Sequence, residues 1–167
     1  MAKQVRGIIG DRLDILIATL GTAKPATFEE TMTDDFDGMF AVNVRAPFLL
    51  IEQFLPLMCK GRCIISITSS AAPSTSGVLS AYAGMTGAIK TISWLLASRL
   101  RPRGIRVNLI ALREADAASS NFPTIHASHG LALSRPAERL EQFDDAATVV
   151  AALGSNDARF VASETFG

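Results

Sequence analysis

Three short runs constrain the fold of this chain more than any other feature: Asp14–Ile17, Cys63–Ile67 and Ile105–Leu112. Each follows a polar turn and is mostly apolar rather than alternating, which is typical of a strand buried on both faces of a parallel sheet. Two long stretches with helical periodicity separate the runs, and a third follows them. This alternation predicts an α/β fold in which helices cover both faces of a parallel sheet.

The first long helix is expected at Phe36–Met58, where apolar residues recur every three to four positions. Thr33 is the candidate N-cap, because its hydroxyl can accept an unpaired backbone N–H of the first turn. Pro47 lies inside this helix and lacks a backbone N–H, so a bend is expected near it. A shorter helix is predicted at Met1–Gly10 and ends at its glycine.

The second long helix is expected at Tyr82–Arg99. Its apolar stripe includes Leu95, whereas Trp94 falls outside the stripe, so this helix is expected to bury a second face. A last helix is predicted at Asp144–Leu153, and Thr165–Phe166 marks the approach to a further strand.

The composition indicates one globular domain. A chain of 167 residues is long enough for a substantial core, so residues 1–167 are taken as one unit. Hydrophobic residues make up 49% and charged residues 19%, which excludes a disordered chain. The formal net charge is zero and indicates no nucleic-acid partner. No apolar run has the length of a membrane span, and Met1–Arg12 is too polar for a signal peptide, so the cytoplasm is the expected location.

The cysteines and histidines give no metal-site pattern. Cys59 and Cys63 have no further ligand near them and are expected to be buried or half-buried free thiols. His126 and His129 are expected to be loop residues, with a role in a substrate pocket as the alternative. Four arginines are expected to form the solvated end of a helix and the turn after it, with a phosphate-binding patch as the alternative. These are Arg99, Arg101, Arg103 and Arg106.

A stretch rich in Ser and Thr follows the second apolar run and leads to the helix that carries Tyr82 in its first turn. Parallel α/β sheets bind their ligands at the carboxyl ends of the strands, where this stretch is expected to lie. Strand, hydroxyl loop and tyrosine helix together resemble the active site of the short-chain dehydrogenases/reductases (SDR). The resemblance runs over nearly the whole chain. It rests on Val42-Asn43-Val44, Ser66-Ile67-Thr68-Ser69, Tyr82 and Arg106-Val107-Asn108.

The resemblance implies a Rossmann-like three-layer α/β/α fold and hydride transfer between NAD or NADP and a small carbonyl or alcohol substrate. It implies that Tyr82 is the acid/base and that Ser69, thirteen residues earlier, positions the carbonyl, with Ser70 as the alternative. It also implies that Asn43 takes part in a proton relay, and that no metal is needed. The cofactor-binding positions that it implies are Gly21, Thr68 and Leu112.

Four departures from the family pattern affect the cofactor. Two of them are altered segments: Ala18-Thr19-Leu20-Gly21 stands where the family has Asn-Asn-Ala-Gly, and Leu112-Arg113 where it has Pro-Gly. The family has a lysine four positions after the tyrosine, whereas this chain has the uncharged Thr86. Without a nearby positive charge, a tyrosine with the ordinary pKa of about 10 is a poor base near neutrality. Lys90, one helical turn further on, is an alternative source of charge or simply a solvated lysine. Gly7 and Gly10 follow no strand, so the Gly-rich pyrophosphate motif and the first strands of the family fold are predicted to be absent.

Two functions fit the sequence. One is an SDR-type oxidoreductase with impaired turnover, and the other is a non-catalytic SDR-like domain that acts by binding or oligomerisation. The strand at Asp14–Ile17 is expected to present an apolar edge that oligomerisation covers. The resemblance implies a homo-oligomer, a dimer or a tetramer, that forms through the Tyr82–Arg99 helix. Neither the substrate nor the choice between NAD and NADP follows from the residues.

Overall fold

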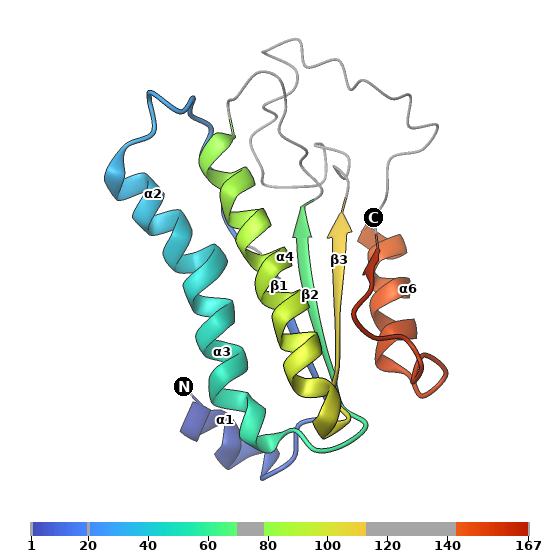
Figure 1. Ribbon diagram of the computed structural model, residues 1–167. Coiled ribbons are helices and arrows are strands. Elements are labelled where there is room, and N and C mark those ends of the chain that lie inside the picture. The colour runs from blue at the N-terminus through green and yellow to red at the C-terminus, as the bar shows by residue number, and fades with distance from the viewer. Residues whose placement is uncertain (1, 20, 70–78, 113–142, 167) are drawn as a thin grey trace.

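The computed structural model describes residues 2–19, 21–69, 79–112 and 143–166 (Figure 1). Its strands form one parallel sheet in the order β1 (Ile15–Thr19), β2 (Cys63–Ser69), β3 (Arg106–Leu112) and β4 (Thr165–Phe166). Its α-helices are α1 (Ala2–Ile9), α2 (Thr33–Phe40), α3 (Ala46–Phe54), α4 (Ser80–Leu100) and α6 (Phe143–Gly154). The predicted parallel α/β fold is confirmed. Ser70, His126 and His129 lie outside the described residues.

Alternate residues of β2 face two helical layers. Ile64 packs with residues of α3 and α4 on one face, whereas Cys63 and Ile65 pack with Leu153 of α6 on the other. Figure 1 shows α2, α3 and α4 together on one side of the sheet, with α6 apart from them beside β3. Both β2 and β3 are buried along almost their whole length, as the apolar runs predict.

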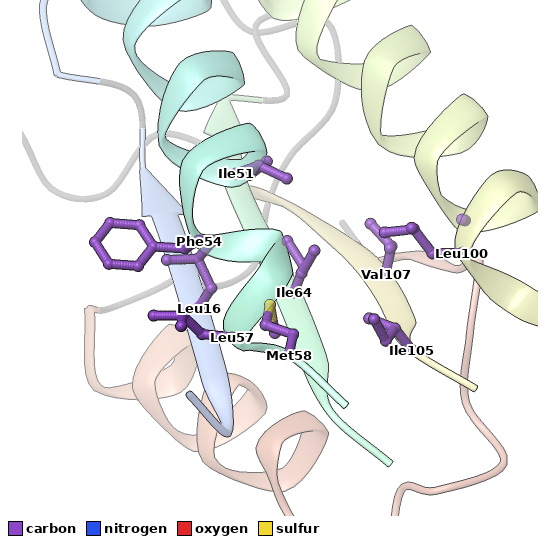
Figure 2. Close-up of a cluster of buried hydrophobic side chains, with 10 residues drawn as sticks. Leu16, Ile51, Phe54, Leu57, Met58, Ile64, Leu100, Ile105 and Val107 are labelled. Carbon is purple, nitrogen blue, oxygen red and sulfur yellow. The ribbon is translucent and has the colours of Figure 1, made fainter. Parts of the chain in front are cut away.

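The largest core cluster fills the space between the sheet and helices α3 and α4 (Figure 2). Each of its side chains is at least nine-tenths buried, and burying a Leu or Ile side chain contributes about 2 kcal/mol. The cluster occupies the amino-terminal halves of the strands, so their carboxyl ends are left for other contacts. Its members are Leu16, Ile51, Phe54, Leu57, Met58, Ile64, Ala97, Leu100, Ile105 and Val107.

Strand β1 is not buried on both faces as predicted. Leu16 and Ala18 are buried, whereas Ile15 is 40% exposed and Ile17 46% exposed. The end of α6 lies close to Ile15, since a Cβ placed at Gly154 would lie 2.9 Å from Cδ1 of Ile15. The prediction was wrong because an apolar run shows that a strand can be buried, not which surface covers it.

The predicted helix Phe36–Met58 is interrupted by a π-helical turn at Ala41–Arg45. Pro47 follows this turn and has no N–H to give to the carbonyl four residues earlier, that of Asn43. The interruption expected near the proline therefore takes the form of a π-helical turn, a feature that is frequent at functional sites.

Two further expectations about this helix were wrong. Met32, not Thr33, occupies the N-cap position of α2, and no side chain caps the helix. The second expectation was that no apolar run has the length of a membrane span. The helical stretch Thr33–Leu57 is long and apolar enough to span a membrane, and 33% of its most apolar part is buried inside the molecule. The core helix of a globular protein passes the same test, so this observation is weak evidence for a membrane.

Helix α4 buries one face and exposes another. Met85, Ile89 and Leu100 are buried as expected, whereas Trp94 is 66% exposed and Leu95 54% exposed. The second buried face predicted from Trp94 is therefore not covered by the described part of the chain, and the prediction for Leu95 was wrong.

Both cysteines are free, and they differ in exposure. Cys63 is buried at the start of β2, whereas Cys59 lies in the exposed turn before this strand, so the prediction for Cys59 was wrong. Burial raises the pKa of the Cys63 thiol, and this effect outweighs the opposing influence of Arg106 and a hydrogen bond with Asn108.

Two arginines bind helix ends near the amino end of the sheet. Arg103 donates from Nη2 to the carbonyls of Leu55 and Met58, each at 3.1 Å, where the α3 layer ends. Arg106 donates from Nη1 to the carbonyl of Leu153 in the last turn of α6 at 2.8 Å. A cation at a helix C-terminus is stabilised by the carbonyl dipoles there. Arg106 is buried, so the prediction that it is solvated was wrong.

We expect Arg106→Met to lower the free energy of unfolding by about 3 kcal/mol. The substitution removes the donors to the carbonyls of Leu153 and Ala158 and leaves these carbonyls without that partner. Urea denaturation followed by circular dichroism measures the change. Arg99→Met is the matched control, since Arg99 is exposed and its loss should cost less than about 0.5 kcal/mol. Equal losses in the two variants would contradict the role of Arg106.

Candidate active site

The predicted catalytic serine and tyrosine meet at the carboxyl end of β2. Ser69 is the last residue of β2, and Tyr82 lies in the first turn of α4. Their side chains are hydrogen-bonded to each other, and Tyr82 is only 7% exposed. Leu112, the last residue of β3, is the register partner of Ser69 and lies at the same edge. The structure therefore brings together the two hydroxyl groups that the family resemblance implies.

The surroundings of Tyr82 favour its neutral phenol. Burial raises the pKa of Tyr82 above its ordinary value of about 10, and the hydrogen bond with Ser69 lowers it by a smaller amount. Within the described ranges, no charged side chain contributes to the shift. Tyr82 is therefore a proton donor near neutral pH.

Position 86, where the family has its lysine, carries no charge and no free hydroxyl proton. Thr86 lies one helical turn after Tyr82 and is 3% exposed. Its Oγ1 donates to the carbonyl of Ala83 at 2.8 Å, within the same helix. Lys90 lies on the exposed side of α4. The contacts of these residues give no support to Lys90 as a replacement for the family's lysine.

A buried pair of serines sets the position of α4 along β2. Oγ of Ser93 donates to Oγ of Ser66 at 3.0 Å in an otherwise apolar interface. Buried hydroxyls need such partners, so the helix is favoured at the one position along the strand where this bond forms. Because Ser66 is on the strand of Ser69 and Ser93 is on the helix of Tyr82, the bond also helps to set how Ser69 and Tyr82 meet.

Asn43 lies in the π-helical turn and is completely buried. Its Oδ1 accepts from the backbone N–H groups of Gly21 and Thr22, each at 3.1 Å, and its Nδ2 donates to the carbonyl of Thr22 at 2.6 Å. Nδ2 also lies 3.8 Å from Sδ of Met85 in α4. These contacts make Asn43 a positioning residue for the chain that follows β1. Its part in a proton relay stays a prediction.

The segment after β1 packs closely on the helical layer. A Cβ at Gly21 would lie 3.1 Å from Cγ1 of Val42, so a side chain there would push the segment away from the π-helical turn. The backbone N–H of Lys24 donates to Sδ of Met39 at 3.2 Å. The side-chain Nζ of Lys24 lies 2.6 Å from a carboxylate oxygen of Asp35. The predicted cofactor position Gly21 is thus held at a defined place on the carboxyl edge.

The other two predicted cofactor positions differ from each other. Thr68 is 3% exposed, and its Oγ1 is buried with no hydrogen-bond partner among the described residues, so its hydroxyl points into the interior. Leu112 is half-buried and packs against the cluster beneath α6. The cofactor contacts of both residues stay predictions.

Three contacts at this edge were missed in the sequence. Met39 and Met85 accept hydrogen bonds through sulfur, yet a hydropathy pattern counts methionine only as an apolar residue. Ser93 could have been found as a polar residue on the buried stripe of a helix. For metals, the described residues contain no group of His, Cys, Asp or Glu that could hold an ion.

Comparison with known proteins decides the family. The profile of the family described as Enoyl-(Acyl carrier protein) reductase matches residues 1–166. An uncharacterized oxidoreductase of Methylorubrum extorquens is 33% identical over 98% of this chain and 69% of its own length. A short-chain dehydrogenase of Burkholderia cenocepacia, solved in complex with NADP, has a TM-score of 0.84 at 25% identity. The chain belongs to the short-chain dehydrogenase/reductase family.

The SDR fold extends over the described sheet and helices. A dehydrogenase/reductase of Sinorhizobium meliloti has a TM-score of 0.86 at 30% identity and covers 99% of this chain. The Rossmann-like α/β/α architecture implied by the resemblance is therefore confirmed. This SDR chain spans only part of its relatives, namely 65% of the Sinorhizobium protein and 67% of the Burkholderia protein.

The single tyrosine of the chain makes its ionisation directly measurable. We expect tyrosinate absorbance in the folded protein to appear with a midpoint above about 10, because burial disfavours the phenolate. Ser69→Ala should raise the midpoint further, since it removes the hydrogen bond that lowers the pKa. Thr86→Lys should lower the midpoint by about one pH unit, because it places an ammonium group one helical turn away.

The raised pKa of Tyr82 also determines how the stability of the fold changes with pH. Burial raises the pKa of Tyr82 above that in the unfolded protein, so the neutral phenol stabilises the fold. This stabilisation is fully present below the unfolded pKa of about 10 and is lost as the pH rises through the folded-state pKa. Lys90→Ala, an exposed change on the same helix, is the control and should leave the midpoint in place. A midpoint at or below 10 in the folded wild type would contradict the buried neutral phenol.

Proposed function

We propose that this SDR chain contributes the proton-donating half of an NAD(P)-dependent oxidoreductase that reduces a small carbonyl compound. The observation that carries the proposal is the hydrogen-bonded pair of Ser69 and Tyr82 at the carboxyl edge of the sheet. Ser69 would orient the carbonyl oxygen, and Tyr82 would donate a proton to it as negative charge develops. The exposed and the buried free thiol are compatible with a reducing cytoplasm.

The residues at this edge fit the cofactor only in part. A bound NAD(P)H would supply the hydride, and the NADP in the Burkholderia structure supports this cofactor class. Gly21 and Leu112 offer a small and an apolar surface for a nicotinamide ring. Thr86 does not fit the lysine's role, because it is neutral and its hydroxyl donates to Ala83. Turnover is accordingly expected to be low, and alcohol oxidation lower still, because a neutral phenol is not a base.

The misfit at position 86 favours a second candidate, an SDR-like domain without turnover that acts by binding or by oligomerisation. Titration of the chain with NADPH and NADH, followed by calorimetry, separates the two candidates. Saturable binding and carbonyl-dependent NADPH consumption support the oxidoreductase. In that case Tyr82→Phe should lower turnover by about a hundredfold, and Thr86→Lys should raise it. No binding of either nucleotide would leave only the non-catalytic candidate.

We also propose that the chain forms a homo-oligomer through the helical layer α2–α4. Six large apolar side chains of this layer are between 41% and 66% exposed, and exposed apolar side chains gathered on one layer are typical of an interaction site. A second copy is the occupant that fits, since the family oligomerises and a two-fold axis pairs a patch with itself. The exposed residues are Phe36, Phe40, Phe48, Leu49, Trp94 and Leu95.

The single tryptophan tests this interface, because its fluorescence reports Trp94 alone. We expect its emission to shift to shorter wavelength as the protein concentration rises, in step with dimer formation in sedimentation velocity. Leu95→Arg should yield monomers, since it places a charge in the apolar interface. The control is Phe160→Ser, which removes an exposed aromatic residue after α6, outside the proposed interface. This variant should dimerise like the wild type. A monodisperse monomer at all concentrations would reject the proposal.

A further inference from the structure

The amino end of the sheet carries exposed apolar side chains on helix α1. In this helix Val5 packs against the largest core cluster, whereas Ile8 is 85% exposed and Ile9 39% exposed. Figure 1 shows α1 at the end of the sheet where α4 ends and where β2 and β3 begin. The N–H of Leu13 donates to the carbonyl of Leu57 at 3.0 Å, which holds the segment after α1 against the end of the α3 layer. The two isoleucines are therefore presented to solvent at a defined place.

Two short turns lie side by side at the same end, one before β2 and one before β3. The N–H of Gly61 donates to the carbonyl of Gly104 at 2.8 Å, and the N–H of Arg106 donates to the carbonyl of Arg62 at 2.9 Å. A Cβ at Gly104 would lie 2.7 Å from Cγ of Lys60, so the stem of Lys60 packs across the second turn. The two turns therefore form one continuous surface.

This surface is basic, and the turns themselves contain no carboxylate. Asp14, which lies next to them, already binds two arginines, since its Oδ1 is 2.6 Å from Nη1 of Arg62 and 3.0 Å from Nη2 of Arg12. Three further cations are exposed and have no carboxylate within ion-pair distance among the described residues: Lys60, Arg99 and Arg101. Their positive charge is thus available to a partner.

Positive and negative charges are separated along the sheet, which a formal net charge of zero conceals. Lys24 is the only lysine or arginine between residues 20 and 44. The acidic residues of that stretch lie near the start of α2, at the carboxyl end of the sheet (Figure 1), and are Glu29, Glu30, Asp34, Asp35 and Asp37. At the amino end, the chain after α6 carries both signs of charge, in Asp157 and Arg159. The resulting field orients the α1–α4 side of the amino end toward a negative surface.

We propose that the amino end of the sheet binds the surface of an anionic lipid membrane, with Ile8 and Ile9 as apolar anchors and Lys60, Arg99 and Arg101 as cations. Apolar side chains of an amphipathic helix enter the boundary of the acyl chains, while lysine and arginine are attracted to anionic headgroups. A nucleic acid or a soluble polyphosphate would use the cations and leave the isoleucines in water. The inference goes beyond the proposed oxidoreductase function, because the hydroxyl pair lies at the opposite end of the sheet.

The test is co-sedimentation of the 167-residue chain with vesicles, without nucleotide. Binding is expected to vesicles rich in phosphatidylglycerol and not to vesicles of pure phosphatidylcholine. Raising the salt from about 0.1 M to about 1 M should weaken binding, because the screening length falls from about 10 Å to about 3 Å. Ile8→Ser should lower the affinity about tenfold, since it removes an apolar anchor. Lys60→Gln and Arg101→Gln should each lower the affinity about fivefold.

Two exposed residues away from the amino end provide matched controls. Phe28→Ser removes an apolar side chain that is 80% exposed in the segment after β1, and Lys90→Gln removes a cation from α4. Both variants should bind vesicles like the wild type, and circular dichroism checks that every variant is folded.

Absence of binding to the anionic vesicles, or equal affinity of the wild type and Ile8→Ser, would overturn the inference. Binding of soluble tripolyphosphate without binding of vesicles would assign the cations to a free anion and reject the lipid surface. A loss in Phe28→Ser or Lys90→Gln as large as that in Ile8→Ser would place the contact elsewhere on the molecule and reject it as well.

Discussion

The carboxyl edge of the sheet depends on the buried side-chain amide of Asn43. It bonds to two N–H groups and one carbonyl of the segment after β1, and it touches Met85 in α4. Each of these backbone groups would cost about 1–3 kcal/mol if it were buried without a partner. The π-helical turn is the local irregularity that presents the amide toward the strand, and Pro47 accounts for why the helix is irregular there. A single side chain thus connects a strand, two helices and the site.

Much of the fold could be predicted because β2 and β3 are buried on both faces. A strand of that kind must be apolar throughout, so its sequence is distinctive. The errors at the exposed apolar residues share one cause. Ile15, Ile17, Trp94 and Leu95 are apolar and were expected inside, yet each is 40% or more exposed. Hydrophobicity shows that a side chain favours burial, but the identity of the covering surface depends on three-dimensional packing, which a local pattern does not contain.

The candidate site was predictable where the resemblance to the SDR family assigns a position to each residue. A fixed separation between a strand end and a helix start places Ser69 beside Tyr82. The supporting contacts do not follow such a rule. The sulfur of Met39 as an acceptor, and the bond of Thr86 to its own helix, depend on distances of a few ångström that several backbones could satisfy or miss. The sequence therefore indicates the candidate reacting groups more readily than the groups that hold them.

The arginine contacts lie at the opposite end of the sheet from the hydroxyl pair. Arg103 lies just before β3, and Arg106 is the first residue of this strand. Arg103 binds the end of the α3 layer and Arg106 the end of α6, on opposite faces of the sheet. The arginine contacts that hold the helical layers are thus spatially separated from the hydroxyl pair, although Asn43 stabilises the fold at the carboxyl edge. A substitution at position 86 leaves the arginine contacts in place. A fold organised in this way can lose one chemistry and acquire another while it remains stable enough for selection to act on it.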